Sequence, residues 1–449
     1  MPSYCRWLKL TGSPADPHHM NRGGTGLRRR LRAIAVSAAT VLALLPSIGA
    51  QAAGSSAAPD LTAGEMGSGP APFPIVVPDG SMRGATFKWS DLDASDAWAK
   101  ASIDYVGKAK DWMRDFAPGA DGKVPFKPDM VETRKYFARA AVKAFAPDET
   151  IDSAITFPDL EPSQTFFRWA NVAVKLGWMR RTTDGRFAPD KPVTMATVHR
   201  VLIQALGMRD VAKQLDNLHT RDGVAFGTPA NFGALMLGLR LGLRYNSSIE
   251  ANDVGPSTPM PRSQVAYSLY KAKNLESWVV PYVRDQYDGI VLPKMGPSRQ
   301  AIVRWGVHYV GYPYVWGGEW GFKTSEPSAL GGQPIPGFDC SGLSWWNLRA
   351  NDGGAWTISP PRPYGGWALP QRTSADMASA GQLKYDQLLP GDLMFYDGDL
   401  DGTVDHVDTF IGNGYALDSS STPGGVTIMW VGDGWYRDHF VHGRRVLPA

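Results

Sequence analysis

The sequence contains almost no cysteine: Cys5 and Cys340 are the only two among 449 residues. This scarcity excludes a small fold held together by several disulfides. The chain also lacks a strong excess of one charge, because its formal net charge is only +3 at pH 7. Nucleic acid is therefore not an expected partner.

The first 52 residues have the three regions of a secretory signal peptide. A basic cluster precedes the apolar run AIAVSAATVLALLPSIGA, and a small-residue site ending at Ala52 follows it. The run is too short and too interrupted to span a membrane stably. We predict cleavage after Ala52, Met20 as the true start codon, and a mature protein that is extracellular or associated with the cell wall, without a membrane span.

Cleavage would leave a mature chain with a single thiol, at Cys340. It would also remove seven basic residues against one acidic residue, so the mature chain becomes slightly acidic. About 400 mature residues are too many for one compact domain. An exported protein with one unpaired cysteine carries either a reactive group or a buried inert thiol.

Residues 53–84 are rich in Gly, Ser, Ala and Pro and are interpreted as a flexible linker. Residues 85–275 contain a repeat. The tetrapeptides Phe126–Asp129 and Phe187–Asp190 lie 61 residues apart, each before a helical pattern, and a fainter third copy covers 259–272. Repeats of this period predict stacked helical units that bury their apolar faces against one another.

These copies resemble S-layer homology modules. The resemblance implies three modules in a pseudo-threefold, all-α bundle that binds cell-wall polysaccharide, with a T-R-A-E-like motif lining the groove. The chain has Thr133-Arg134 in the first copy and Pro261-Arg262 in the third, but Thr194-Met195 in the second. A helical spacer without a ligand is the alternative.

Residues 276–296 are interpreted as a second linker, with some extended character. A helix is predicted to begin at Ser298 and to end at Gly311. Alternating apolar strands follow, with the sequences DLMFYD, HVDTFIGN, YALDSS and GVTIMWV. The pattern predicts an α+β domain over 297–449, with helices packed on an antiparallel sheet.

Cys340 lies where the local sequence favours a reactive thiol. Asp339 can cap a short helix that begins at the cysteine, and the helix dipole then stabilises the thiolate. His406, at the start of a predicted strand, is the best local candidate for the base, and Asp418 lies in the next strand of the predicted hairpin. A carboxylate on a neighbouring strand can hold the imidazole in the productive tautomer.

Five motifs in order resemble the NlpC/P60 family of cysteine peptidases, which have a papain-like fold. They are GYPYVWGG at 311–318, FDCSGL at 338–343, RTS at 372–374, PGDL at 390–393, and DHV with IGNG over 405–414. The resemblance implies Cys340 as the nucleophile, His406 as the base and Asp418 as the third polar residue. It also implies oxyanion or substrate contacts for Tyr314, Asp339 and Ser341, although capping and packing would equally explain Ser341.

The resemblance further implies hydrolysis of stem peptides of peptidoglycan, often between D-glutamate and the diamino acid, with no required cofactor. Two alternatives stay open. One is a non-catalytic wall-binding or structural envelope protein, and the other is an amidase or acyltransferase on the same fold.

The turn before His406 matches the ligand spacing of a calcium loop, around Gly402 at its sixth position. A structural Ca²⁺ is therefore predicted, and a solvated acidic turn is the alternative. The predicted ligands are Asp397, Asp399, Asp401, Asp405 and Asp408.

Overall fold

A computed structural model of the chain describes residues 70–76, 86–322, 333–350 and 362–448. All of them belong to one compact unit. The predicted signal peptide (1–52) and most of the first predicted linker (53–84) lie outside the described residues. Within the described ranges, no helix is long and apolar enough to cross a membrane.

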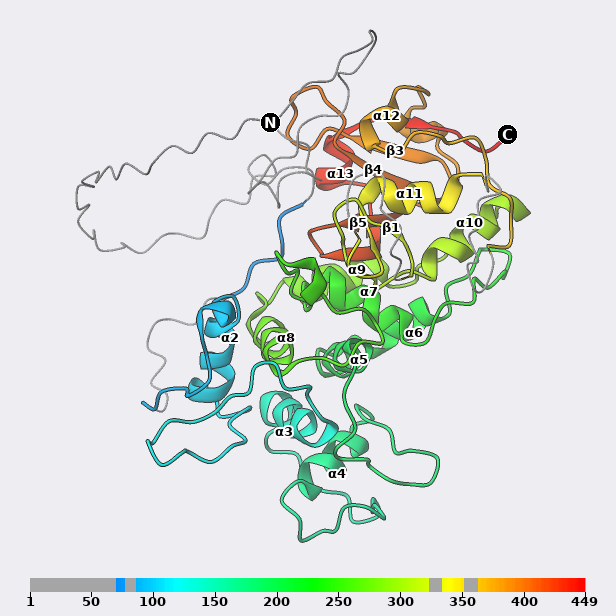
Figure 1. The fold of residues 1–449 in the computed structure, drawn as a ribbon. Coiled ribbons are helices and arrows are strands. Elements are labelled where there is room, and N and C mark those ends of the chain that lie inside the picture. Colours follow the sequence, from blue (N-terminus) through cyan, green and yellow to red (C-terminus); the bar gives the residue numbers. More distant parts are fainter. Residues whose placement is uncertain (1–69, 77–85, 323–332, 351–361, 449) are drawn as a thin grey trace, which may run out of the picture. The chain divides into compact units, whose positions relative to one another are not determined.

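The first part of this unit is helical (Figure 1). Its α-helices are α2 (Lys100–Asp104), α3 (Arg134–Phe145), α4 (Phe167–Lys175), α5 (Met195–Ala205), α6 (Arg209–Asp216), α7 (Phe232–Arg240), α8 (Arg262–Asn274) and α9 (Val279–Tyr287). Short non-α turns of helix lie at η2 (Ala94–Asp96), η3 (Tyr105–Ala109) and η4 (Glu250–Asn252).

Three segments that precede α3, α5 and α8 are joined by a closed ring of backbone hydrogen bonds. The amide of Glu132 donates to the carbonyl of Met260 (2.8 Å), that of Met260 to Val193 (2.9 Å), and that of Val193 to Glu132 (2.9 Å). Each segment thus donates to one neighbour and accepts from the other. The starts of the three helices are therefore arranged around a local pseudo-threefold axis.

The dipeptides predicted to line a binding groove lie at these helix starts. Arg134 and Arg262 are the first residues of α3 and α8, and Met195 is the first residue of α5. The guanidinium Nε of Arg134 donates to the carbonyl of Phe187 (2.7 Å), and that of Arg262 donates to Phe126 (2.9 Å). Each arginine therefore forms a hydrogen bond with the first residue of the Phe tetrapeptide (126–129 or 187–190) of another copy.

The segment predicted as a second linker, 276–296, contains a helix. Helix α9 buries Val283 and Tyr287 completely, and the Tyr287 hydroxyl donates to the carbonyl of Ile428 (2.8 Å). The interpretation as a partly extended linker is corrected because these apolar side chains pack into the core.

Residues 70–76, in the first predicted linker, are bound to the helical part. Ile75 pairs with Leu275, and the ring of Phe73 packs edge-on against Trp278 and Tyr282. This portion is therefore ordered by apolar and backbone contacts, although its composition predicts a spacer.

The C-terminal part is α+β, as predicted. Its helices are α10 (Pro297–Val307), α11 (Cys340–Leu348), α12 (Ser374–Ala378) and α13 (Gly434–Asp438), with a 3₁₀ turn η5 (Tyr385–Gln387). Its strands are β1 (Glu319–Trp320), β2 (Gly337–Phe338), β3 (Leu393–Tyr396), β4 (His406–Gly412), β5 (Tyr415–Ser420), β6 (Gly425–Trp430) and β7 (Phe440–Arg444).

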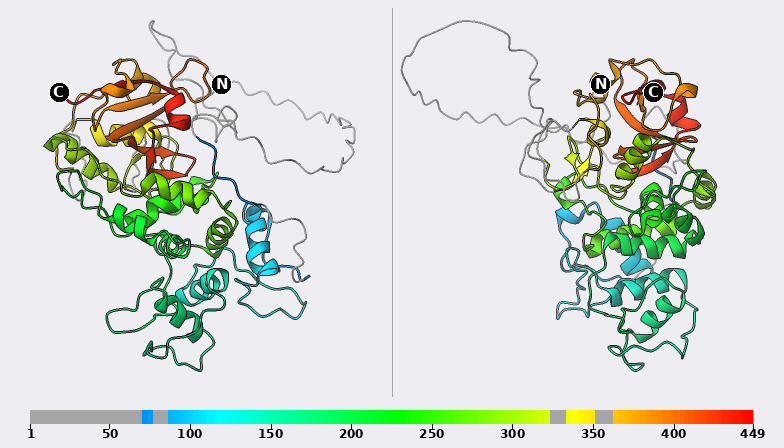
Figure 2. Two further views of the ribbon diagram at one scale, coloured as in Figure 1. Left: turned by 180° about the vertical axis from the view of Figure 1, so that it is seen from behind. Right: turned by 90° about the vertical axis from the view of Figure 1, so that its right-hand side faces the viewer.

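Strands β3 to β7 form one antiparallel sheet in the order β6-β5-β4-β3-β7, and Figure 2 shows these orange and red strands side by side. The four predicted strands are thereby confirmed. Helix α10 begins earlier than predicted, because Gly296 is its N-cap and Pro297 is its first residue, where a missing N–H has no cost. It ends at Val307, before Gly311.

Helix α11 packs on this sheet and brings its first residue, Cys340, toward the start of β4. Ser344 on α11 lies 3.5 Å from Thr409 on β4, Oγ to Oγ1. The hydroxyl of Ser419 on β5 donates to the carbonyl of Phe338 (2.8 Å), two residues before the cysteine. These contacts place the helix start beside the strands that carry the candidate base.

Candidate active site

Cys340 is the first residue of α11, and Asp339 is the N-cap, as predicted. The Asp339 carboxylate accepts a hydrogen bond from the amide of Gly342 (2.5 Å), and the Cys340 side chain is only 1% exposed. The free amides and the dipole at a helix start stabilise negative charge. The helix start therefore supplies electrostatic stabilisation for a negative charge on the Cys340 sulfur.

His406, the first residue of β4, lies beside the thiol. Its Nε2 atom is 3.0 Å from Oδ1 of Asp418 and 3.2 Å from Oδ1 of Asp408. Burial opposes the imidazolium, but the charge of Asp408 and hydrogen bonds to Asp408, Asp418 and Cys340 outweigh it and raise the pKa of His406. The site therefore stabilises an imidazolium next to a nucleophilic sulfur.

The imidazole is fixed by its surroundings. Because Nε2 faces the carboxylates, Nδ1 is the ring nitrogen left to exchange a proton with the thiol. The ring also lies near Tyr396 and Tyr436, with ring centres 5.6 and 6.5 Å away. Burial raises the pKa of both tyrosines well above the ordinary value, so they remain neutral.

Asp418 is held in turn by a serine. The hydroxyl of Ser420 lies 2.8 Å from Oδ2 of Asp418, so the two carboxylate oxygens have different partners. The predicted set of Cys340, His406 and Asp418 is thus brought together in one place, and all three side chains are buried. A nucleophile, a base and an orienting group in contact can perform acyl transfer.

Asp408 belongs to this cluster, not to the acidic turn in which it was predicted to be a calcium ligand. The pairing of Thr409 with Leu417 places Asp408 opposite Asp418, and alternation along β4 puts it on the same face as His406. Burial and the charge of Asp418 raise the pKa of Asp408 to about 7. The spacing of two residues from His406 along a strand could have revealed this neighbour from the sequence.

Asp339 and Ser341 are engaged inside the protein rather than at an open surface. Arg372, from the RTS motif, donates to Asp339 (3.2 Å) and to the Ser341 hydroxyl (2.8 Å), and its Nε is 2.6 Å from Glu319. Burial disfavours the guanidinium charge, yet the two carboxylates raise the pKa of Arg372. This network supports the capping and packing interpretation of Ser341. The sequence analysis did not identify Arg372 as the partner of Asp339 and Ser341, or Glu319 as the second carboxylate bound by Arg372.

Tyr314, predicted to contact the oxyanion or the substrate, is buried and lies beside the backbone that leads into Cys340. It forms an isolated bridge with Phe338, and its amide donates to the carbonyl of Gly424 (3.0 Å). Its role in binding remains a prediction.

Three of the five predicted calcium ligands lie together. One carboxylate oxygen each from Asp397, Asp399 and Asp401 falls within 4.8 Å of the others. Asp405 instead accepts a hydrogen bond from the amide of Gly398 (3.2 Å). Carboxylate oxygens are hard ligands, and on a tight turn they suit Ca²⁺. Calcium binding by Asp397, Asp399 and Asp401 therefore stays a prediction.

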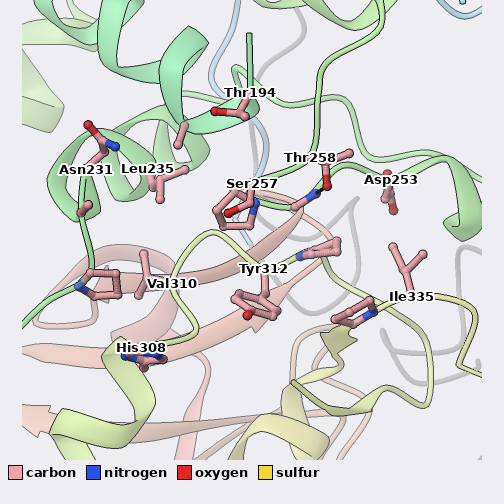
Figure 3. Close-up of a pocket in the computed structure, with 17 residues that line it drawn as sticks. Thr194, Asn231, Leu235, Asp253, Ser257, Thr258, His308, Val310, Tyr312 and Ile335 are labelled. Atoms are coloured by element: carbon pink, nitrogen blue, oxygen red, sulfur yellow. Dashed lines mark hydrogen bonds between the residues drawn. The ribbon is translucent and has the colours of Figure 1, made fainter. Parts of the chain in front are cut away.

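A pocket of about 570 Å³ lies away from this cluster, between the helical part and the residues after α10. Figure 3 shows Thr194, Asn231 and Leu235 facing Val310 and Tyr312 across it. Cys340, His406 and Asp418 do not line it.

A buried cysteine at a helix start, paired with a carboxylate-bound histidine on an antiparallel sheet, defines a site of the thiol peptidase type. Comparison with known sequences agrees: residues 311–445 match the NlpC/P60 family, so the C-terminal part is an NlpC/P60 domain.

Curated relatives have similar sequences over part of the chain. The bifunctional muramidase/DL-endopeptidase CwlT of Bacillus subtilis is 26% identical over 186 residues, 41% of this chain and 47% of that protein. The gamma-D-glutamyl-L-lysine dipeptidyl-peptidase of the same organism is 27% identical, over 36% of this chain and 45% of that protein. The chain therefore spans about half the length of these relatives.

Among solved structures, that of the peptidoglycan hydrolase RipB from Mycobacterium tuberculosis matches with 27% identity. It covers 36% of this chain and 76% of that chain, with a TM-score of 0.25.

Proposed function

We propose that the protein is a secreted, wall-associated cysteine peptidase that hydrolyses amide bonds in the stem peptides of peptidoglycan. The observation that carries this proposal is the cluster of Cys340 at the start of α11, His406 at the start of β4, and Asp418 at 3.0 Å from the imidazole. One relative is named as a muramidase/DL-endopeptidase and another as a gamma-D-glutamyl-L-lysine dipeptidyl-peptidase, and these names support the substrate class.

The reaction follows from the arrangement. The Cys340 sulfur attacks the carbonyl carbon of the peptide bond, and the imidazolium of His406 gives its proton to the departing amine. A thioester forms as the C–N bond breaks. Water, deprotonated by the now neutral His406, then hydrolyses the thioester and restores the thiolate and imidazolium. Asp418 keeps the ring oriented and balances its charge through both steps.

We further propose that the scissile bond joins D-glutamate to the diamino acid. One relative is named a gamma-D-glutamyl-L-lysine dipeptidyl-peptidase and another a DL-endopeptidase. The aligned part covers less than half of either relative, so the bond that this chain cleaves is a proposal.

The test is digestion of chemically defined peptidoglycan by the mature protein, with mass spectrometry of the products. A Cys340→Ala variant that keeps its circular dichroism spectrum and melting temperature is the matched control. New stem-peptide fragments from the wild type alone would support the peptidase and identify the bond. No product from either protein, with continued binding to walls, would favour a non-catalytic binding protein.

Two other outcomes address the amidase or acyltransferase alternative. Release of intact stem peptide from the glycan would indicate an amidase. Formation of a new amide or ester with an added amine or alcohol acceptor, in preference to hydrolysis, would indicate an acyltransferase.

We also propose that the helical repeats bind a wall polysaccharide. The pocket in Figure 3 supports this idea, because the repeats supply hydroxyl groups of Thr194, Ser257 and Thr258 and the start of the C-terminal part supplies the ring of Tyr312. Hydroxyls and an aromatic ring are suited to a sugar, which offers both hydrogen-bonding edges and apolar faces. Walls stripped of secondary polymer should then pellet less of the Cys340→Ala protein than intact walls, and Tyr312→Ala should reduce pelleting on intact walls.

A further inference from the structure

A second pocket lies beside the turn that follows the Asp418 strand. It has a volume of about 200 Å³ and is formed by the ends of α7 and α8, residues 70–73, and residues 421–423 after β5. Its charged lining residues are Arg240, Arg244 and Lys271, and none of its described lining residues is acidic. The pocket is therefore positively charged.

Several polar atoms of this pocket have no partner within the described part of the chain. The Nε atoms of Arg240 and Arg244 and the hydroxyl of Ser421 are buried without a hydrogen bond. The Lys271 amine makes no ion pair or hydrogen bond with any residue that the structure describes, and burial lowers its pKa. Buried polar groups are nearly always paired, so a set of unpaired donors points to an acceptor ligand.

Neighbouring acids do not neutralise the pocket. Asp253 lies 3.8 Å from Arg244 and balances that one charge. Arg240 donates to the neutral amide of Gln286 (3.2 Å) and lies over the ring of Phe73. Two cationic groups, Arg240 and Lys271, therefore remain without a carboxylate partner in the described residues.

The pocket adjoins the candidate active site through one short turn. The Ser420 hydroxyl lies 2.8 Å from both the Asp418 carboxylate and the carbonyl of Thr422, which lines the pocket. The carbonyl of Gly424 accepts hydrogen bonds from the amide of Tyr314 and from Arg244. The turn thus has the pocket on one side and groups of the active site on the other.

We propose that this pocket binds a free carboxylate of the stem peptide, with Lys271 as its ion-pair partner. The inference rests on the proposed peptidase function. A volume of about 200 Å³ corresponds to roughly six or seven waters, enough for a carboxylate and one amino-acid residue.

The consequence is a preference for acidic over amidated stem peptides. Conversion of the bound carboxylate to an amide removes its charge and replaces acceptor oxygen with a donor nitrogen, which the donors of the pocket cannot satisfy. We expect an acid-to-amide preference of about tenfold or more, since a charge-assisted hydrogen bond commonly contributes that factor.

A binding test does not require turnover. The Cys340→Ala protein is titrated by NMR with N-acetyl-D-alanine and, separately, with N-acetyl-D-alanine amide. We expect shifts of Lys271 and Ser421 resonances with the acid only, and about tenfold weaker binding after Lys271→Gln. Lys271→Arg retains the charge and should retain binding.

Lys273→Gln is the matched control, because Lys273 is on the same helix but lies over Phe145 and does not line the pocket. It should bind the acid like the parent protein. Equal binding of acid and amide, or unchanged binding after Lys271→Gln in a folded protein, would overturn the proposal.

The kinetic test separates this inference from the proposed function. Wild type and Lys271→Gln are compared on a stem peptide with a free carboxylate and on its amidated form. A higher KM for the acid in Lys271→Gln, with a reduced acid-to-amide preference, is expected. Hydrolysis by both proteins with the same acid-to-amide preference would refute the carboxylate-binding role of the pocket but support the peptidase activity. No hydrolysis of either peptide by the wild type would refute the peptidase activity itself.

Discussion

The Nε2 atom of His406 lies 3.0 Å from Oδ1 of Asp418, a residue twelve positions later on the adjacent strand. The short β4–β5 hairpin, with Asn413 in a left-handed conformation at its turn (φ 51°), makes this approach possible. The orienting carboxylate is thus supplied by the strand next to the one that carries the base. The geometry gives the imidazole one defined orientation toward Cys340.

Asp418→Asn should lower kcat by about 100-fold or more, because the amide no longer balances the imidazolium and can hold the wrong tautomer. KM should change much less. Steady-state kinetics on a stem peptide checks this, with Asp386→Asn, on the η5 turn, as the control. A kcat within a factor of three of wild type would show that Asp418 does not act on His406.

Asp408→Asn should stabilise the protein above pH 7. The raised pKa of Asp408, about 7, means that the folded state holds the proton more tightly than the unfolded chain. Its stabilising contribution is therefore full below about pH 4 and is lost as the pH rises to about 7. Melting temperatures of both proteins at pH 4 and pH 8 measure this effect, and a variant less stable than wild type at pH 8 would contradict it.

The contribution of His199 to the free energy of unfolding should change with pH in the opposite direction to that of Asp408. Burial lowers the pKa of His199 to about 3, so the unfolded chain binds a proton that the folded protein rejects. Stability is full above about pH 6.5 and should fall by roughly 1.4 kcal/mol per pH unit between about 6.5 and 3. Urea unfolding at several pH values tests this, and His199→Leu should remove that part of the slope.

Arg372→Met should cost about 3–5 kcal/mol of unfolding free energy, because it leaves Asp339 and Glu319 buried without their cation. Denaturant unfolding measures the loss. Arg186→Met is the control, since its ion pair with Asp184 is exposed and should contribute little. Equal losses for the two variants would refute the importance of the buried network.

Calcium should raise the melting temperature by a few degrees if Asp397, Asp399 and Asp401 bind it, because a ligand that binds only the folded state stabilises it. Chelation by EGTA should also lower activity, since the turn leads into the strand of His406. Asp399→Asn should abolish the effect of calcium. Identical melting curves and activity in excess calcium and in EGTA would exclude a structural ion.

Some features follow from the sequence because they depend on local chemistry. Asp339 before an apolar helix predicts the cap, and alternation along 406–412 and 415–420 predicts two paired strands. The spacing between His406 and Asp418 then predicts their contact, since a tight hairpin fixes the register of neighbouring strands. The nucleophile could be named because the only thiol of the predicted mature chain follows Asp339 at a predicted helix start, within the FDCSGL motif.

Other features depend on residues that are distant in the sequence. The sequence spacing of Asp408 fits a calcium loop. In the folded sheet, alternation along β4 and pairing with β5 instead place its side chain next to His406. The cation that binds Asp339 is Arg372, which also binds Glu319, so this network joins three distant positions. Arg240 and Lys271, which have no carboxylate partner among the described residues, meet the turn at 421–423 only after the helices pack. The sequence by itself determined the elements and the chemical groups of the site, because local hydrogen bonding and periodicity specify them. Tertiary structure alone decided which buried charges meet, because burial and pairing arise only when the chain has folded.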